Sequence, residues 1–306
     1  MAPSTRPICD YEGSAYRTEF WGQGRDYEDG VERVALQRLL PPAGRRLIEI
    51  GAGYGRLAPL YSGYDEVVFF DYAFSQLEQA QELWGEAGPG GRPRYTYAAG
   101  DFYQLPFAPG LFDAVTTIRV LHHAADAPAV LAGLAEIIAP GGTLVLEFAN
   151  KCHLLSILRY LLRRQTWSPF DPAPVEFVAL NYDFHPAWVR RQLHRVGLAI
   201  AKTRTVSHFR LGLLKRLVPT PLLVAMDSLV QWTGALWQLT PSVFVQCKKP
   251  EGGTPTPGDA FFRCTACGAT GLADEGAALS CAACGARFAV RDGICDFKTP
   301  LQGGAA

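Results

Sequence analysis

Three glycines at alternate positions follow a short apolar run in the first quarter of the chain. The segment reads Glu49-Ile50-Gly51-Ala52-Gly53-Tyr54-Gly55-Arg56. Glycines between a strand and a helix let the backbone approach a ligand closely at the carboxyl edge of a parallel sheet. A dinucleotide-binding turn requires its third glycine at position 56, where this chain has Arg56. The spacing therefore predicts a ligand site and argues against a dinucleotide as its ligand.

A second set of residues with ligand chemistry lies near the end of the chain. Two Cys-x-x-Cys pairs, each followed by glycine and thirteen residues apart, consist of Cys264, Cys267, Cys281 and Cys284. Each pair can hold a metal from one tight turn, and two pairs complete a tetrahedral thiolate site. We predict zinc, with iron as the alternative because the ligand set is the same. Four protein ligands leave no open coordination position, so the predicted role of the metal is structural.

The segments that would position the glycine turn alternate between strand and helix. Apolar runs predict strands over 47–50, 67–70, 95–98, 114–118 and 143–148, followed by two later strands over 198–206 and 242–247. Helical spacing and stop signals predict helices over 27–40, from about 55, and over 74–84, 127–138 and 151–164, with one more starting at 185–188. Continuous apolar strands separated by helices are typical of a parallel sheet covered on both faces. The predicted fold class is therefore α/β.

The composition divides the chain into four parts. Residues 1–45 are predicted to be a helical N-terminal cap, residues 46–249 the α/β domain, residues 250–258 a proline- and glycine-rich linker, and residues 259–299 a metal-binding ribbon. A module of about forty residues has too little core to fold without a staple such as a metal. We expect the linker to let the ribbon fold apart from the α/β domain, and residues 287–294 to form a hairpin within it.

The order of motifs after the glycine turn resembles that of the class I methyltransferases, which use S-adenosylmethionine (SAM). Their first motif is an acid followed by glycines at alternate positions, as in Glu49 to Gly55. In this sequence Asp71 ends the second predicted strand, Gly100-Asp101-Phe102 follows the third, and Pro140-Gly141-Gly142 precedes the fifth. Within this family the chain is similar to the group that includes the ubiquinone and menaquinone biosynthesis methyltransferases. The resemblance covers residues 45–150 closely and residues 1–250 more loosely, and it implies a Rossmann-like sheet of seven strands with helices on both faces.

The resemblance also implies SAM as the cofactor and a set of cofactor-binding residues: Glu49, Gly51, Ala52, Gly53, Gly55, Asp71, Tyr72, Asp101 and Phe102. In the family, an acid at the position of Asp71 holds the ribose hydroxyls, which charge-assisted hydrogen bonds can do. An acid at position 101 takes the adenine amino group, and its neighbour packs on the ring. Two structural alternatives stay open. Asp71 could instead cap the helix that begins at Phe74, and Asp101 could be a turn residue.

Candidate catalytic residues lie where the fourth predicted strand ends. They are Arg119, His122 and His123. Methyl transfer from a sulfonium depends on aligning the acceptor and excluding water, and a general base is needed only if the acceptor loses a proton. Arg119 could bind an anionic acceptor or pair with an acid of the N-terminal segment. One of the two histidines could be a core residue or the start of a helix.

An apolar insert, residues 209–241, separates the last two predicted strands. It begins with Lys215 and Arg216 among leucines and carries Trp232 and Trp237 near its end. One interpretation is helical packing against the sheet edge, with both tryptophans in the core. The other is a hydrophobic lid or an interfacial surface for a lipid-like acceptor. The longest apolar stretch is interrupted by Asp227, so we expect no membrane-spanning helix.

The charge balance limits the classes of partner. Lysine and arginine number 29, and so do aspartate and glutamate, so nothing draws the chain as a whole towards nucleic acid. No secretory signal is visible at the N-terminus. We therefore expect a methyltransferase that acts on a small metabolite or lipid-like acceptor in the cytoplasm and touches a membrane, if at all, through residues 209–241. The alternatives are an RNA-modifying methyltransferase that docks its substrate through the ribbon, and a SAM-binding scaffold without activity.

Overall fold

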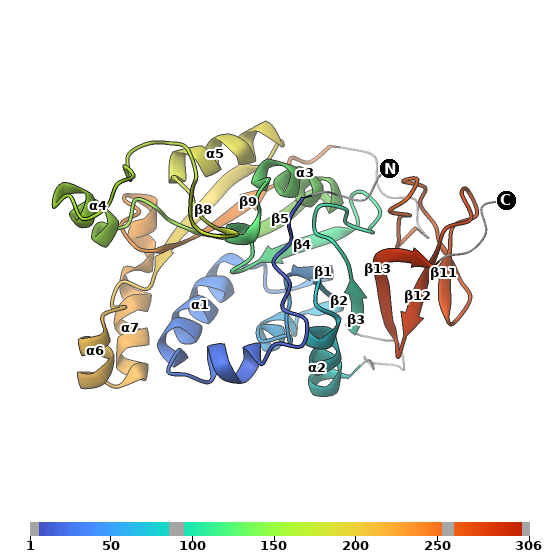
Figure 1. Cartoon of the computed structure of the whole chain (residues 1–306), viewed down its shortest axis with the longest axis horizontal. Coiled ribbons are helices and arrows are strands. Elements are labelled where there is room, and N and C mark those ends of the chain that lie inside the picture. The colour runs from blue at the N-terminus through green and yellow to red at the C-terminus, as the bar shows by residue number, and fades with distance from the viewer. Residues whose placement is uncertain (1–5, 86–94, 253–259, 302–306) are drawn as a thin grey trace.

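The computed structural model describes residues 6–85, 95–252 and 260–301, so most of the predicted linker lies outside the described residues. Eleven strands form one sheet, in the order β10-β11-β12-β13-β3-β2-β1-β4-β5-β9-β8 (Figure 1). The seven strands of the predicted α/β domain are β1 (Gly44–Ile50), β2 (Tyr64–Asp71), β3 (Tyr95–Ala99), β4 (Phe112–Thr117), β5 (Ile138–Ala149), β8 (Ala199–Val206) and β9 (Ser242–Lys248).

The predicted α/β fold class is confirmed by the pairing of these seven strands. β3, β2, β1, β4 and β5 run parallel, and β9 is antiparallel to both β5 and β8. Parallel strands bring their carboxyl ends to one edge of the sheet. The turns that follow β1, β2 and β4 therefore meet at that edge, where ligands bind in folds of this kind.

Helices cover both faces of this sheet. They are α3 (Ala127–Ile137) and α5 (Pro186–Arg195) on one face, and α1 (Asp26–Leu39) and α2 (Phe74–Trp84) on the other (Figure 1). Neighbouring residues of β2 belong to opposite cores: Val68 packs in the cluster that contains α3 and α5, and Val67 in the cluster that contains α1 and α2. Successive side chains of a strand point to opposite faces, so a strand that is apolar throughout must be covered on both.

One predicted helix is wrong. After the glycine turn the chain forms only a 3-10 turn, Ala58–Tyr61, where a helix was expected from about Gly55. β2 begins at Tyr64, so the segment between the glycine turn and β2 has room for no more than this turn. The other predicted helices are present, and α2 has the bounds that the sequence predicts.

The C-terminal strands continue the sheet beyond β3. They are β10 (Ala273–Asp274), β11 (Ala278–Ser280), β12 (Arg287–Arg291) and β13 (Ile294–Leu301). β12 and β13 form the predicted hairpin. β13 then pairs in parallel with β3, with Ile294 beside Tyr97 and Asp296 beside Ala99. The expectation that the ribbon folds apart from the α/β domain is therefore wrong, because β13 covers the backbone groups of β3, which would otherwise be an edge strand.

The ribbon also shares apolar cores with the α/β domain. Phe288 and Phe297 belong to the cluster on the α3 side of the sheet, and Ile294 belongs to the cluster on the α1 side. Phe262 forms an antiparallel bridge with Phe107. These contacts join residues that are far apart in the sequence. The composition of the predicted linker, residues 250–258, does not reveal such contacts. The boundaries predicted for the four parts of the chain stay predictions.

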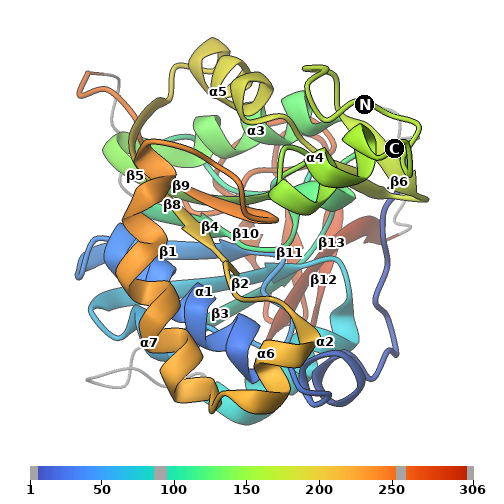
Figure 2. The same cartoon turned by 90° about the vertical axis from the view of Figure 1, so that its left-hand side faces the viewer.

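The predicted insert lies at the opposite end of the sheet (Figure 2). It forms α6 (Gly212–Leu217), α7 (Thr220–Val230) and a 3-10 turn (Gln231–Ala235). α7 packs against α1, where the Tyr27 hydroxyl donates a 2.7 Å hydrogen bond to the buried carboxylate of Asp227. Trp232 and Trp237 are each 55% exposed, so the interpretation that places them in the core is wrong. Among the described residues, no helix has the length and apolar character needed to cross a membrane.

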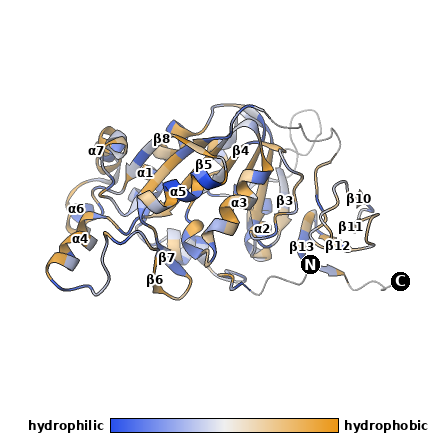
Figure 3. Cartoon of the chain, turned by 90° about the horizontal axis from the view of Figure 1, so that it is seen from above, coloured by the Kyte–Doolittle hydropathy of each residue, from blue (hydrophilic) through white to orange (hydrophobic). Residues whose placement is uncertain are grey.

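Two further elements extend this end of the molecule. They are α4 (Leu154–Leu161) and a hairpin of β6 (Val175–Val178) and β7 (Asn181–Asp183), of which the sequence predicted only the helix. α4 begins where the insert ends, since the Leu154 amide donates a 2.8 Å hydrogen bond to the Leu239 carbonyl. Seen from above, α4, α6 and α7 lie at one end and the ribbon strands at the other (Figure 3).

Candidate functional site

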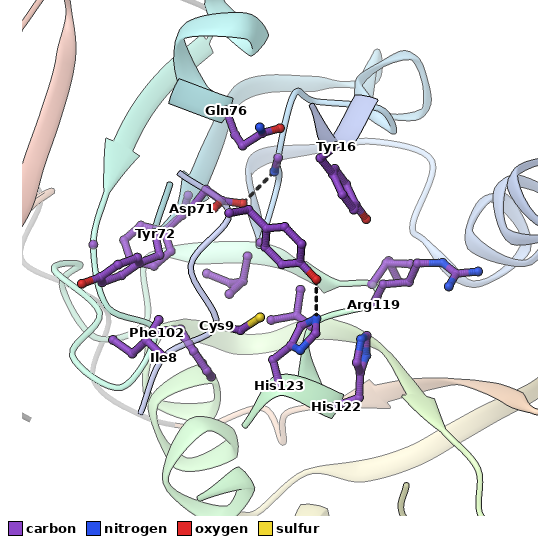
Figure 4. A pocket seen from close by; sticks show the side chains of 18 of the residues that line it. Ile8, Cys9, Tyr16, Asp71, Tyr72, Gln76, Phe102, Arg119, His122 and His123 are labelled. Carbon is purple, nitrogen blue, oxygen red and sulfur yellow. Dashed lines mark hydrogen bonds between the residues drawn. The ribbon is translucent and has the colours of Figure 1, made fainter. Parts of the chain in front are cut away.

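A cavity lies at the carboxyl ends of β1, β2 and β4, over the glycine turn (Figure 4). Eight of the predicted site residues line this first cavity: Gly51, Gly53, Asp71, Tyr72, Phe102, Arg119, His122 and His123. Glu49 and Ala52 line a small adjoining cavity, and Gly55 and Asp101 line neither. The structure therefore brings together the ends of four strands that the sequence separates by up to seventy residues.

The three glycines of the turn all have positive φ, between +54° and +72°. A Cβ on Gly51 would lie 2.2 Å from Val120, and a Cβ on Gly55 would lie 2.7 Å from the Trp84 ring. These two positions therefore need glycine for packing within the protein. At Gly53 the space towards the cavity is open, with only Tyr16 at 3.9 Å, so this glycine leaves the backbone accessible to a ligand.

The carboxylate of Asp71 holds the glycine turn against the end of β2. It accepts hydrogen bonds from the Gly53 amide at 2.8 Å and from the Ala73 amide at 2.9 Å, and burial raises the pKa of the carboxyl. The amides of Phe74 and Ser75, at the start of α2, are instead bound by the carboxylate of Glu12. The alternative in which Asp71 caps the helix at Phe74 is therefore wrong, and Asp71 faces the cavity (Figure 4).

Glu49 is a buried acid at the end of β1. Burial raises the pKa of its carboxyl to about 8, and Oε2 accepts no hydrogen bond from any described residue. A buried polar atom without a partner costs free energy. A cationic or hydrogen-bond-donating ligand in the small cavity would remove that cost.

The predicted adenine-binding pair lies at the end of β3. Phe102 lines the first cavity and stacks on Tyr103 with a centroid separation of 4.5 Å. Asp101 accepts a 2.7 Å hydrogen bond from the Tyr103 amide and does not line the cavity. This bond is the turn contact that the sequence offered as the alternative, and the cofactor contact of Asp101 stays a prediction.

Arg119 lies between the cavities with a positive φ of 59°. Its Nε donates a 2.7 Å hydrogen bond to Glu32 of α1, and its backbone amide donates a 3.0 Å bond to Glu147. Burial opposes the charge of the guanidinium, but Glu32 and Glu147 outweigh it and hold the pKa of Arg119 above its usual value. Of the two roles that the sequence left open for Arg119, the structure shows the ion pair with an acid of the N-terminal segment.

The two histidines differ in their surroundings (Figure 4). His123 is hydrogen-bonded to the Tyr11 hydroxyl at 3.2 Å and to the Leu180 carbonyl at 2.9 Å. His122 is half-buried beside His123 and Arg119, and within the described part of the chain its ring has no hydrogen-bond partner. Burial and the two neighbours lower the pKa of His122 well below its usual value. The lowered pKa favours the neutral imidazole of His122, which lines the cavity.

A strap formed by residues 6–21 crosses the first cavity and was only partly predicted. The sequence predicted a helical cap, but within the strap only Tyr16–Trp21 is helical, as a short π-helix. Ile8, Cys9 and Tyr11 of the strap line the cavity, and none of them was among the predicted site residues. The aromatic residues at positions 11, 16 and 20 are the one sequence signal that could have indicated this role.

A second cavity adjoins the first on the side away from the glycine turn. It shares Arg119 and His122 with the first cavity and extends to His153, Phe177 and Arg210. Glu147 lies in its wall, where its carboxylate accepts a 2.5 Å hydrogen bond from the Ser242 hydroxyl. A molecule in the second cavity would contact His122 from one side while a ligand in the first cavity contacts it from the other.

The four cysteines of the ribbon converge. Their sulfur atoms all lie within 4.8 Å of one another, with 3.7 Å between Cys264 and Cys284 and 3.6 Å between Cys267 and Cys281. A tetrahedral site with metal–sulfur bonds of about 2.3 Å requires sulfur atoms about 3.8 Å apart. The observed spacing fits such a site. A separate contact links the ribbon to the first cavity: Lys298 of β13 lies 3.8 Å from Glu12 of the strap and 5.3 Å from the centre of the Tyr72 ring.

Comparison with known proteins agrees with this geometry. The family model described as a methyltransferase domain matches residues 48–146. The chain is 31% identical to the O-methyltransferase cnsE of Penicillium expansum over 147 residues, which are 45% of this chain and 52% of that protein. It is 33% identical to the demethylmenaquinone methyltransferase of Beutenbergia cavernae over 141 residues, which are 45% and 50%. The chain thus spans about half the length of these curated relatives.

Solved structures show the same fold. A chain of the complex between the Haloferax volcanii Trm112 methyltransferase activator and a methyltransferase has a TM-score of 0.53 at 17% identity, covering 78% of this chain and 97% of that one. An S-adenosylmethionine dependent methyltransferase from Mesorhizobium loti has a TM-score of 0.50 at 17% identity, covering 73% and 100%. At these identities the likeness shows the fold alone. Together, the family match over residues 48–146 and the solved structures show a segment that is similar to the methyltransferase domain model and lies within a Rossmann-like fold.

Proposed function

We propose that the protein transfers a methyl group from SAM to a small, partly apolar acceptor. The observation that carries this proposal is that the matched residues 48–146 supply most of the wall of the first cavity. Relatives named as O-methyltransferases and demethylmenaquinone methyltransferases support an acceptor of this size.

The groups around the first cavity fit the cofactor. The unpartnered Oε2 of Glu49 would accept hydrogen bonds from the ammonium of the methionine moiety. Asp71 would hold the ribose hydroxyls, since a carboxylate beside two hydroxyls makes charge-assisted hydrogen bonds. Phe102 would lie against the adenine ring, and Asp101 would reach its amino group. Tyr11, on the strap, would exclude water from the site.

The bound cofactor would supply an electrophilic methyl group, and the chain would align the acceptor and keep water out. His122 would accept the proton of an acceptor hydroxyl at its free ring nitrogen. Arg119 and His123 are bonded to other parts of the protein, so we assign them positioning roles. Arg119 holds α1 against the cavity through Glu32, and His123 anchors the strap through Tyr11.

We place the acceptor in the second cavity. His122 is common to both cavities, so an acceptor there would meet the methyl group next to the proposed base. Phe177 gives the outer part of this cavity an apolar wall, as a partly apolar acceptor requires. The lid predicted from the sequence combined the N-terminal segment with the insert. Residues of the N-terminal strap line the first cavity, whereas Trp232 and Trp237 of the insert line neither cavity.

We further propose that the ribbon holds one zinc ion and takes no part in the chemistry, since four thiolates fill the coordination sphere. Thiols that bind metal must stay reduced, which supports a cytoplasmic protein. Docking of a substrate such as RNA through the ribbon is less favoured than methyl transfer to a small acceptor, because β13 already lies against β3.

Two measurements test the proposed function. Calorimetry should detect SAM binding to the wild type, and Asp71→Ala should weaken it about ten- to a hundredfold, the loss of roughly 1.5–3 kcal/mol of charged hydrogen bonding. Asp65→Ala, an exposed acid on the same strand, should bind as the wild type does. Release of labelled methyl groups from SAM onto metabolite and lipid fractions would separate an enzyme from a scaffold. Binding of NADH in place of SAM would refute the proposal.

A further inference from the structure

Helix α4 turns its apolar side chains outward. Leu154, Leu155, Leu158 and the pair Leu161 and Leu162 are all exposed, the last two by 65% and 63%. Ser156 is the one residue of α4 that is fully buried. An ordinary amphipathic helix buries its leucines against the protein, whereas α4 presents them to the surroundings. This arrangement is typical of helices that lie in a membrane interface.

The apolar surface continues from α4 onto the insert. Leu213 and Leu217 of α6, Leu229 of α7, and Trp232 and Trp237 beyond it are exposed as well. α4 and the insert meet at the hydrogen bond between Leu154 and Leu239, and they lie at the same end of the molecule (Figures 2 and 3). We call this surface the apolar face. Exposed large apolar side chains gathered at one end of a molecule are typical of an interaction site.

The apolar face carries positive charge and almost no negative charge. Arg159, Arg163 and Arg164 lie on or just after α4, and the described residues offer them no acidic partner in an ion pair. α4 contains no acid, and the single acid of the insert, Asp227, is buried against Tyr27. Lys215 of α6 is paired with Glu28 at 2.9 Å, whereas Arg216 forms no ion pair with any described residue.

A row of adjoining cavities lies between this face and the proposed methyl-transfer site. An outer cavity is lined by the three arginines of α4 together with Trp167 and Phe177. It shares His153, Phe177 and Asp183 with the second cavity, which in turn shares His122 with the first. Asp183 is an acid in the wall that the outer and second cavities share. These shared walls place His122 at the inner side of a series of adjoining cavities that begins at the apolar face.

We propose that the apolar face docks on an anionic phospholipid surface, with the leucines of α4 and the two tryptophans of the insert among the acyl chains and the α4 arginines at the phosphates. The docked face holds the outer cavity against the headgroups, so that the acceptor enters from the lipid. The docking stands on the surface alone, and only the acceptor route rests on the proposed methyltransferase function.

The charge of the face distinguishes a lipid surface from a second copy of the chain. A two-fold dimer brings the same patch of both copies together, and here it would bury the α4 arginines of both copies in one interface to which α4 contributes no acid. Nucleic acid would pair with the arginines but leave the leucines uncovered. A bilayer with anionic headgroups satisfies both the arginines and the leucines.

Vesicle sedimentation tests the docking. The wild type should bind phosphatidylcholine vesicles that contain phosphatidylserine, bind pure phosphatidylcholine far more weakly, and lose affinity as salt rises. Arg163→Ala/Arg164→Ala should weaken binding about thirtyfold, since each cation near an anionic surface contributes about fivefold. The matched control is Arg190→Ala/Arg191→Ala, two adjacent exposed arginines on α5, which should bind as the wild type does.

A second pair of variants tests how much the exposed apolar residues contribute to vesicle binding. Leu161→Asp should abolish vesicle binding, and Leu83→Asp, at an exposed leucine of α2, should not. Brominated lipids should quench the tryptophan fluorescence of the wild type, and Trp232→Phe/Trp237→Phe should lose most of that quenching. Calorimetry with SAM on the same variants should give wild-type affinity, so a failure of docking is distinguished from a failure of the proposed function.

Three results would overturn the proposal. The first is wild-type protein that does not sediment with phosphatidylserine vesicles at low salt. The second is equal binding by Arg163→Ala/Arg164→Ala and its control. The third is a stable dimer in solution that Leu161→Asp dissociates, which would show that a second copy covers the face.

Discussion

The two additions at the ends of the seven-stranded sheet treat their apolar residues in opposite ways. The ribbon buries Phe288 and Phe297 and extends the sheet through β13, so it has become part of the core. The helical end, α4 with α6 and α7, leaves leucines and two tryptophans exposed. The first addition contributes to the stability of the cofactor site, and the second offers a surface to a partner. Apolar residues therefore have different roles in the two additions. Their burial in the structure distinguishes the ribbon from the helical end.

The largest expected effect tests whether the ribbon and the α/β domain stabilise each other or fold independently. Cys281→Ser should release the metal and unfold the ribbon, because a structural zinc site contributes about 10–16 kcal/mol, as much as the roughly 5–15 kcal/mol that stabilises a whole domain. Since β13 covers β3, the melting temperature of the α/β domain and its affinity for SAM should fall too. Elemental analysis, scanning calorimetry and SAM titration measure these effects.

The control for this variant is Cys152→Ser, at a cysteine outside the ribbon whose hydrogen bond to the Pro169 carbonyl a hydroxyl can replace. Cys281→Ser could instead lose its metal while its melting transition and its SAM affinity stay unchanged. That result would show that the ribbon folds independently and does not stabilise the α/β domain.

The next effect contrasts one aromatic residue from each end. Phe288→Ala should lower the free energy of unfolding by about 3–5 kcal/mol, because this ring is fully buried. Trp232→Ala should change it by no more than about 0.5 kcal/mol, because that ring is more than half exposed. Urea unfolding of the two variants measures both values. A large loss of unfolding free energy in Trp232→Ala would show that the Trp232 ring is packed against other residues in solution.

The next prediction concerns the proposed cofactor site, which lies between the two additions. Its affinity for SAM should depend on whether the Glu49 carboxyl is ionised. Its pKa of about 8 means that the carboxyl is protonated at lower pH, whereas an ammonium ligand requires the ionised form. SAM affinity should therefore fall as the pH drops below 8, by up to about tenfold for each pH unit. In Glu49→Gln the affinity should be nearly independent of pH over this range. A slope that persists in that variant would assign the titration to another group.

The smallest expected effect concerns the contact between ribbon and strap. Lys298→Ala removes a partly exposed ion pair with Glu12, and such pairs contribute about 0–1 kcal/mol. SAM affinity should fall by no more than about fivefold, and raised salt should reduce the difference from the wild type. Arg287→Ala, which removes a ribbon ion pair far from the strap, serves as the control. A change of a hundredfold would mean that Lys298 contacts the cofactor directly.

The fold of residues 45–150 could be predicted because its signals are local. Apolar runs gave the strands, and the glycine turn and Asp71 indicated the cavity at their carboxyl ends. The four cysteines were predicted for the same reason, since two CxxC turns specify a metal site by spacing alone. The helix expected from Gly55 failed because its length depends on where β2 begins.

The contacts that the sequence did not reveal join residues far apart in the chain. Glu12 binds the start of α2, Tyr11 anchors to His123, and Arg119 pairs with Glu32. Each of these pairs depends on how the strap and α1 cross the sheet, which no periodicity in either segment specifies. The placement of β13 beside β3 and the outward leucines of α4 are of the same kind, because burial is decided by neighbours that lie elsewhere in the sequence.

The pairing of β13 with β3 sets an order of events during synthesis. β3 leaves the ribosome about 200 residues before β13, and at about 5–20 residues per second the uncovered edge persists for roughly 10–40 seconds. For that time the nascent chain exposes unpaired backbone groups next to Tyr97 and Ala99, a template on which another strand can add. With the proposed zinc ion in the ribbon, this edge would be covered only after the last cysteine turn has bound the metal. A shortage of zinc in the cell would therefore show first as aggregation of newly made chains, while chains that are already folded keep their edge covered.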